Sequence, residues 1–151
     1  MEINDFLSKE RIIVDAQPFS SKKRIIEAIA SCFSKTIETI SKEHVFEQLI
    51  AREKIGSTGM GSGIAIPHAR IAEINQPYAV FMRLQAELNF DAHDNKPVDL
   101  VFALIVPEQA TKLDLQLMQD MTLIFKNKDI IAHLRQTSDI ESIQKTFQTV
   151  I

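Results

Sequence analysis

A nearly continuous run of apolar residues, Val98 to Val106, constrains the fold of this chain more than any other segment. The run ends at Pro107, and its length and composition are typical of a strand that is buried on both faces. Segments with helical spacing of apolar residues precede and follow it. The sequence therefore predicts a layered α/β domain with a central sheet, and it leaves open whether the helices cover one face or two.

Two serine positions indicate where helices begin. Ser20-Ser21 and Ser41 each precede apolar residues at helical spacing, as N-capping residues do. The second of these helices is expected to run to about Arg52-Glu53. Further helices are expected around Leu113–Ile124, Ile130–Leu134 and Ile140–Phe147, and further strands at Gly63–Pro67 and Tyr78–Leu84.

Composition narrows the class of protein. The chain has 151 residues, 45% of them hydrophobic and 25% charged, which predicts a single globular domain over residues 1–151. A net charge of −3 argues against a nucleic-acid binder. Cys32 is the only cysteine, so no intramolecular disulfide can form. Since the chain shows neither a signal peptide nor a membrane span, we expect a soluble, cytoplasmic protein.

All four glycines lie within one stretch of eight residues, 56–63. Because glycine loses much backbone entropy on folding, such a concentration suggests positive φ angles or a close approach of backbone to a ligand. Exposed N–H groups in such a loop can line an anion site, although a tight turn between a helix and a strand is the simpler alternative. The stretch matches neither a nucleotide-binding loop nor the nucleophile elbow of hydrolases.

Of the four histidines, His68 is the candidate for chemistry. It follows the short strand expected at Gly63–Pro67, beside the glycine-rich stretch, where it can be held in place and still be reached by a partner. An imidazole accepts a phosphoryl group well, because one ring nitrogen carries a lone pair near neutral pH. His44 and His133 are expected on the surface and His93 in a loop, and no spacing of residues indicates a metal site.

Several residues near His68 could stabilise a phosphoryl group. Arg52 and Arg70 could neutralise its oxygens, since guanidinium groups suit bidentate contact. Ser57, Thr58 and the backbone amides of the glycine-rich stretch, with Gly61 among them, could donate hydrogen bonds. Positioning and charge stabilisation of this kind supply most of what phosphoryl transfer requires.

Two blocks of sequence resemble a known family. Residues 52–68, from Arg52 through the glycines to His68, and residues 90–107, from Phe90 to Pro107, are similar to the two signature blocks of fructose/mannitol-type enzyme IIA domains. These domains belong to the bacterial phosphoenolpyruvate-dependent phosphotransferase system. The resemblance covers the chain from about Leu7 to the C-terminus. The sequences of both blocks are most similar to those of the nitrogen-regulatory enzyme IIA.

The resemblance implies a mixed sheet flanked by helices, the enzyme IIA fold. It implies phosphorylation of His68 on Nε2 by a phosphohistidine carrier protein, with Arg52 close to that histidine and no metal or organic cofactor. The chain would then be a component of a phosphotransfer chain with a phosphohistidine intermediate. Regulatory targets of such proteins include potassium-transport proteins and sensor kinases.

One position departs from the family pattern. Members usually carry a second histidine early in the helix after the second block, and Asp114 aligns with it, in the pair Asp114-Leu115. If Asp114 lies near His68, its carboxylate repels a phosphoryl group and favours the unphosphorylated state. The alternative is that Asp114 faces solvent in the first turn of its helix, where a carboxylate is favourable.

Three functions remain open from the sequence. The first is a regulatory phosphocarrier of the nitrogen branch, which the absence of a following enzyme IIB or membrane domain favours. The second is a sugar-transport enzyme IIA that passes its phosphoryl group to a separate enzyme IIB. The third is a binding module without phosphotransfer, against which the intact His68 and glycine-rich stretch argue.

Overall fold

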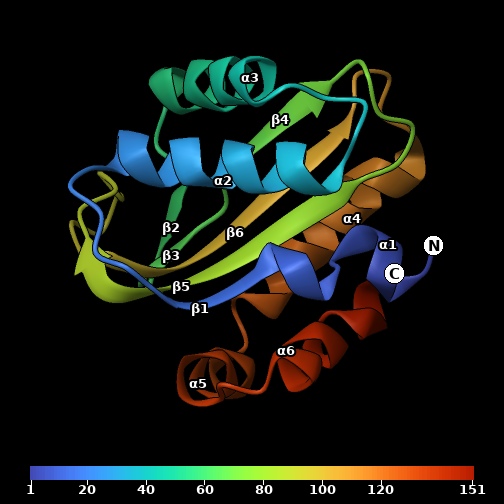
Figure 1. The fold of residues 1–151 in the computed structure, drawn as a ribbon. Coiled ribbons are helices and arrows are strands. Elements are labelled where there is room, and N and C mark those ends of the chain that lie inside the picture. The colour runs from blue at the N-terminus through green and yellow to red at the C-terminus, as the bar shows by residue number, and fades with distance from the viewer.

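The apolar run forms β6 (Val98–Pro107), the strand on which the sheet is assembled. In the computed structural model, which describes residues 1–151 apart from the side chain of Val150, six strands form one mixed sheet between two layers of helices (Figure 1). On one edge β6 pairs antiparallel with β5 (Tyr78–Leu88), which pairs parallel with β1 (Ile12–Ala16). On its other edge β6 pairs parallel with β3 (Ile64–Ala65) and β4 (His68–Ile71). The predicted α/β fold with a central mixed sheet is confirmed.

The remaining elements are the edge strand β2 and the helices of the two layers. They are β2 (Gly59–Gly61), α1 (Ile3–Phe6), α2 (Lys22–Thr36), α3 (Lys42–Ile55), α4 (Lys112–Ile124), α5 (Lys128–Gln136), α6 (Ile140–Thr146) and the 3-10 turns Lys9–Arg11 and Gln148–Val150. Helices α2 and α3 lie over one face of the sheet, and α1, α4, α5 and α6 lie over the other (Figure 1). The helices therefore cover both faces of the sheet, a point that the sequence left open.

The alternation of side chains along β6 explains this arrangement. Val101, Ala103 and Ile105 pack against the core under α2 and α3. Leu100, Phe102, Leu104 and Val106 pack against the second core, under α4, α5 and α6. Because successive side chains of a strand point to opposite faces, both sets are buried and the strand carries an apolar residue at almost every position.

The expected helix starts are confirmed. The Ser21 side chain accepts a hydrogen bond from the backbone N–H of Arg24, and Ser41 accepts one from His44. Each cap satisfies a backbone donor that the first helical turn leaves unpaired. Helix α3 continues two residues beyond the expected end at Glu53, and β5 continues four residues beyond Leu84.

The glycine-rich stretch differs from the expected loop. Gly59–Gly61 forms β2, which pairs antiparallel with β3 and makes a hairpin that turns at Ser62 and Gly63. The backbone of Gly61 has φ +91°, and an added Cβ there would lie 3.1 Å from a carboxylate oxygen of Asp94. A turn of this shape, packed against the loop before β6, requires glycine for steric reasons alone. The simpler of the two readings, a tight turn, accounts for this glycine.

Candidate functional site

The site lies where the chain passes from β3 to β4 along the edge of β6. Strands β3 and β4 pair with β6 in the same register, since Ala65 of β3 lies opposite Val101 and His68 of β4 lies opposite Leu104. Ile66 and Pro67, between them, are not paired as strand residues, although the Pro67 carbonyl still accepts the N–H of Leu104 at 2.9 Å. The N–H of Ile66 donates instead to the carbonyl of Thr58, at 3.0 Å, and Pro67 has no N–H to donate. The expected strand Gly63–Pro67 is therefore a short β3, and His68 begins a separate strand.

The hydrogen bonds of the His68 ring define its tautomer. Nδ1 lies 2.8 Å from the carbonyl oxygen of Ile66, which can only accept, so Nδ1 carries the proton. Nε2 then holds the lone pair, and it accepts a hydrogen bond from Nε of Arg52 at 3.2 Å. The ring is half-buried, with Nε2 as its nucleophilic nitrogen.

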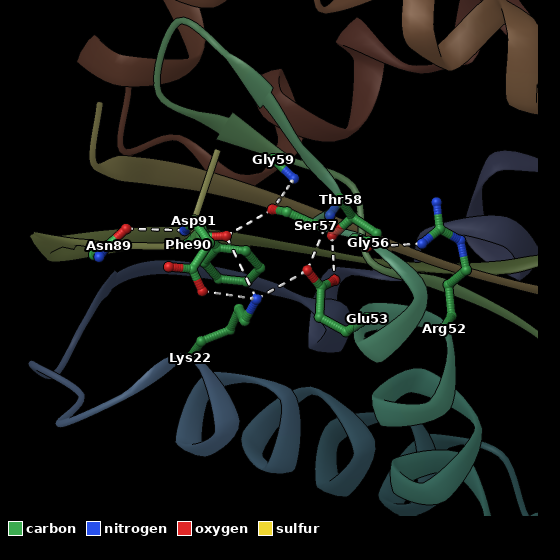
Figure 2. A network of polar contacts seen from close by, with 10 residues as sticks. All are labelled: Lys22, Arg52, Glu53, Gly56, Ser57, Thr58, Gly59, Asn89, Phe90 and Asp91. Atoms are coloured by element: carbon green, nitrogen blue, oxygen red, sulfur yellow. Dashed lines mark hydrogen bonds and ion pairs between the residues drawn. The ribbon is translucent and has the colours of Figure 1, made fainter. Parts of the chain in front are cut away.

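Arg52 reaches this nitrogen from the last turn of α3. Its Nη1 donates to the carbonyl of Gly56 at 2.8 Å, at the end of the same helix, and this second bond orients the guanidinium (Figure 2). The predicted proximity of Arg52 and His68 is thus present. Arg70, the other arginine expected to contact a phosphoryl group, is exposed on β4 and does not line the cavity at His68.

A small cavity of about 250 Å³ opens beside the His68 ring. Its walls come from the end of α3, the start of the hairpin, the β3–β4 junction, β6 and α4. They are lined by Arg52, Ser57, Thr58, Gly59, Met60, Ile66, His68, Leu104, Met118, Met121 and Thr122. The sequence gives no functional signal for Met118, Met121 and Thr122; Met121 is expected there only as an apolar residue of its helix, and the spacing of all three places them on one helix face. Apolar side chains line one side of this pocket and Arg52 lines the other, so that its guanidinium could offer a positive charge to an anion there.

The hydroxyls of Ser57 and Thr58 line the cavity but donate elsewhere. Ser57 donates to the carbonyl of Phe90 at 2.6 Å, and Thr58 donates to a carboxylate oxygen of Glu53 at 2.5 Å (Figure 2). These two residues therefore act as the frame of the pocket in this structure. Gly61, also expected near a phosphoryl group, lies outside the pocket and lines a separate cavity.

Asp114 does not lie in the His68 cavity, contrary to the expectation from alignment. It is the third residue of α4, where its carboxylate accepts the backbone N–H of Thr111 at 2.9 Å. The Thr111 hydroxyl accepts the N–H of Asp114 in return, which completes a capping box. Asp114 is buried and lines a cavity at the N-terminal end of α4 with Pro107 and Gln109. Asp114 is therefore not among the residues that line the phosphoryl site, and the alternative of a solvent-facing carboxylate is not met either, since the residue is 8% exposed.

The other histidines lie apart from this cavity. His44 contacts Glu73 at 3.4 Å, His133 lies 2.9 Å from the hydroxyl of Ser142, and His93 is exposed in the loop before β6. Within the part of the chain that the structure describes, no group of three metal-ligating side chains comes together. No helix among the same residues is long and apolar enough to cross a membrane.

Comparison with known proteins shows the family of the chain. Residues 5–150 match the family described as "Phosphoenolpyruvate-dependent sugar phosphotransferase system, EIIA 2". The chain belongs to this family. A nitrogen regulatory protein of Pseudomonas aeruginosa is 38% identical to it over 143 residues, which cover 95% of this enzyme IIA chain and 92% of the relative.

Solved structures place the fold in the same family. The crystal structure of the nitrogen regulatory protein IIA-Ntr from Neisseria meningitidis has a TM-score of 0.88 and 38% identity, and covers 96% of this chain and 98% of that one. The mannitol IIA of Escherichia coli has a TM-score of 0.74 at 18% identity, with 91% and 96% covered, and at that identity it supports the fold alone.

Proposed function

We propose that this enzyme IIA chain is a regulatory phosphocarrier that accepts a phosphoryl group on Nε2 of His68. The donor is the phosphohistidine of a carrier protein of the phosphotransferase system, and the reaction belongs in the cytoplasm. The observation that carries the proposal is the pair of hydrogen bonds on the His68 ring. They leave the lone pair on Nε2, and they place the Arg52 guanidinium beside it.

The transfer is an in-line displacement at phosphorus. As the donor protein approaches, Arg52 Nε–H stops donating to His68 Nε2 and donates its hydrogen bond to a phosphoryl oxygen instead. The Nε2 lone pair forms the new N–P bond, while the electron pair of the old N–P bond returns to the donor imidazole. The Nδ1 proton stays between the ring and the Ile66 carbonyl, which stabilises the positive charge that develops on the imidazole.

Similarity favours the regulatory branch over sugar transport. The nitrogen regulatory proteins of P. aeruginosa and N. meningitidis are each 38% identical to the chain, against 18% for the mannitol protein. The regulatory role would then rest on binding to partners, such as potassium-transport proteins or sensor kinases, that distinguish the phosphorylated from the unphosphorylated state. A phosphoryl group adds up to two negative charges beside Arg52, enough to change the electrostatic complementarity of that surface.

The test is incubation with phosphoenolpyruvate, enzyme I and the carrier protein, followed by intact mass measurement. We expect one added phosphoryl group, labile in acid and stable in alkali. His68→Ala should remain unmodified, while His133→Ala, which changes a histidine remote from the pocket, should be modified as the wild type is. Full modification of His68→Ala would refute the assignment.

A further inference from the structure

Glu53 is a buried carboxylate directly beside the proposed site. Its side chain is 4% exposed, and it lies in the last turn of α3 next to Arg52. One oxygen accepts the Thr58 hydroxyl at 2.5 Å, and the other accepts the Thr58 backbone N–H at 2.9 Å (Figure 2). The carboxylate thus holds the backbone of Thr58 at the start of the hairpin.

Thr58 connects Glu53 to the His68 ring through two hydrogen bonds of the Ile66 backbone, one to Thr58 and one to the ring. The Thr58 carbonyl accepts the Ile66 N–H at 3.0 Å. The Ile66 carbonyl, in turn, accepts Nδ1–H of His68 at 2.8 Å. A displacement of Thr58 therefore moves the carbonyl that selects the tautomer of the ring.

Lys22 completes the connection from a second helix. Its Nζ lies 3.1 Å from Glu53, 3.4 Å from a carboxylate oxygen of Asp91 and 5.4 Å from the centre of the Phe90 ring (Figure 2). Lys22 is the first residue of α2, and Phe90 and Asp91 belong to the loop between β5 and β6. The ammonium group thereby neutralises the buried carboxylate and ties it to two other segments.

We propose that Glu53 and Lys22 are positioning residues for His68. Glu53 holds Thr58, and through it the Ile66 carbonyl, so that the ring keeps its proton on Nδ1 and its lone pair on Nε2. Lys22 holds the Glu53 carboxylate in this orientation through the contact of 3.1 Å. The proposal rests on the proposed function, in which Nε2 of His68 is the acceptor.

A purely structural role for the pair is the competing explanation. A buried ion pair contributes little net stability compared with apolar residues of similar volume, because burying two charges is costly. The series of contacts from Lys22 through Glu53, Thr58 and Ile66 to His68 gives the pair a second effect, on the tautomer of the His68 ring. The two explanations differ in what happens to the tautomer and reactivity of His68 in a variant that still folds.

The experiment uses the full chain with Glu53→Ala, Glu53→Gln and Lys22→Gln. The matched controls are Glu47→Gln, an exposed glutamate on the same helix, and Lys23→Gln, the exposed neighbour of Lys22. Nitrogen-15 NMR of the imidazole measures the fraction of His68 in each tautomer. Single-turnover phosphorylation is measured with the carrier protein and separately with phosphoramidate, a small donor that needs no protein docking.

We expect Glu53→Ala to lower the Nδ1–H fraction and slow phosphorylation by both donors about 10- to 100-fold, since a displacement near 1 Å can cost about 100-fold in rate. Glu53→Gln and Lys22→Gln should lose less, and the controls should match the wild type. A folded Glu53→Ala with the wild-type tautomer and rates would overturn the proposal. If Glu53→Ala does not fold, unchanged tautomer and rates in Glu53→Gln and Lys22→Gln would overturn it.

The tautomer measurement separates this proposal from the proposed function. If neither donor phosphorylates the wild type, the proposed function fails, and the NMR comparison still decides whether Glu53 controls the ring. If the wild type is phosphorylated and Glu53→Ala is indistinguishable from it, the positioning proposal alone fails.

Discussion

Removal of the Arg52 guanidinium tests the electrostatics of the site. Arg52 Nε lies 3.2 Å from His68 Nε2, so a phosphoryl group on that nitrogen lies within direct reach of the arginine charge. At about 5 Å and an effective dielectric of about 20, one pair of unit charges attracts by about 3 kcal/mol. Arg52 is half-buried, and we discount this to about 1.5 kcal/mol for solvent and salt, which corresponds to about tenfold in rate.

We expect Arg52→Ala to slow single-turnover phosphorylation of His68 about 10- to 100-fold, the upper limit applying if the hydrogen bond tightens in the transition state. Arg52→Lys keeps the charge but loses the planar fork, so its loss should be smaller. Rates are measured with both the carrier protein and phosphoramidate. Arg24→Ala serves as the control, since Arg24 pairs with Glu27 on the exposed side of α2.

An Arg52→Ala variant with wild-type rates for both donors would refute this account of the pocket. A loss confined to the carrier protein would also contradict it, because that result would make Arg52 a docking residue. The loss of the bond to the Gly56 carbonyl should lower the free energy of unfolding by only about 1 kcal/mol. Urea unfolding of the same variants checks that the effect on rate is not an effect on folding.

Three further predictions concern residues outside the pocket. Asp114→Ala should lower the free energy of unfolding by about 1 kcal/mol, by opening the capping box with Thr111, and should leave the phosphorylation rate of His68 unchanged; a changed rate would place Asp114 back at the site. Hydrogen bonds from the backbone N–H groups of Lys96 and Ser62 lower the pKa of Asp94, so its carboxylate stabilises the fold above its unfolded pKa and this contribution is lost as the pH falls through the lowered value. The difference in unfolding free energy between wild type and Asp94→Asn, from urea titrations, should therefore shrink as the pH falls below about 4, and a difference that grows would contradict this sign. Burial raises the pKa of the Cys32 thiol, so Cys32 should react with iodoacetamide more slowly at neutral pH than a free cysteine does, and equal rates would contradict the observed burial.

The sheet and the helix starts were predictable because their signals are local. A strand with apolar residues at almost every position, such as β6, has to be covered on both faces wherever it lies in the chain. Ser21 and Ser41 cap the helices that directly follow them. The proximity of Arg52 and His68 came from the family resemblance, since sixteen residues of separation in the chain carry no geometric information.

The errors occurred where the answer depends on packing between distant segments. Leu113 begins the helix expected over Leu113–Ile124, yet it is 81% exposed, because α4 presents Leu117 and Met121 to the core. The strand β1 (Ile12–Ala16) was missed, as was the break at Pro67 that separates β3 from β4.

For Asp114 a local signal was available. The spacing Thr111-x-x-Asp114 is that of a capping box, and it favoured a structural role over a place at the site. The burial of Glu53 had no such signal, since its partner Lys22 comes from another helix, 31 residues earlier in the chain.

The atom that carries the phosphoryl group tests the central claim most directly. Protein labelled with nitrogen-15 is phosphorylated through phosphoenolpyruvate, enzyme I and the carrier protein, and the imidazole nitrogens are then assigned by NMR. The geometry predicts phosphorus on Nε2 of His68, with Nδ1 still facing the Ile66 carbonyl. Phosphorus on Nδ1, or on any residue other than His68, would contradict the account.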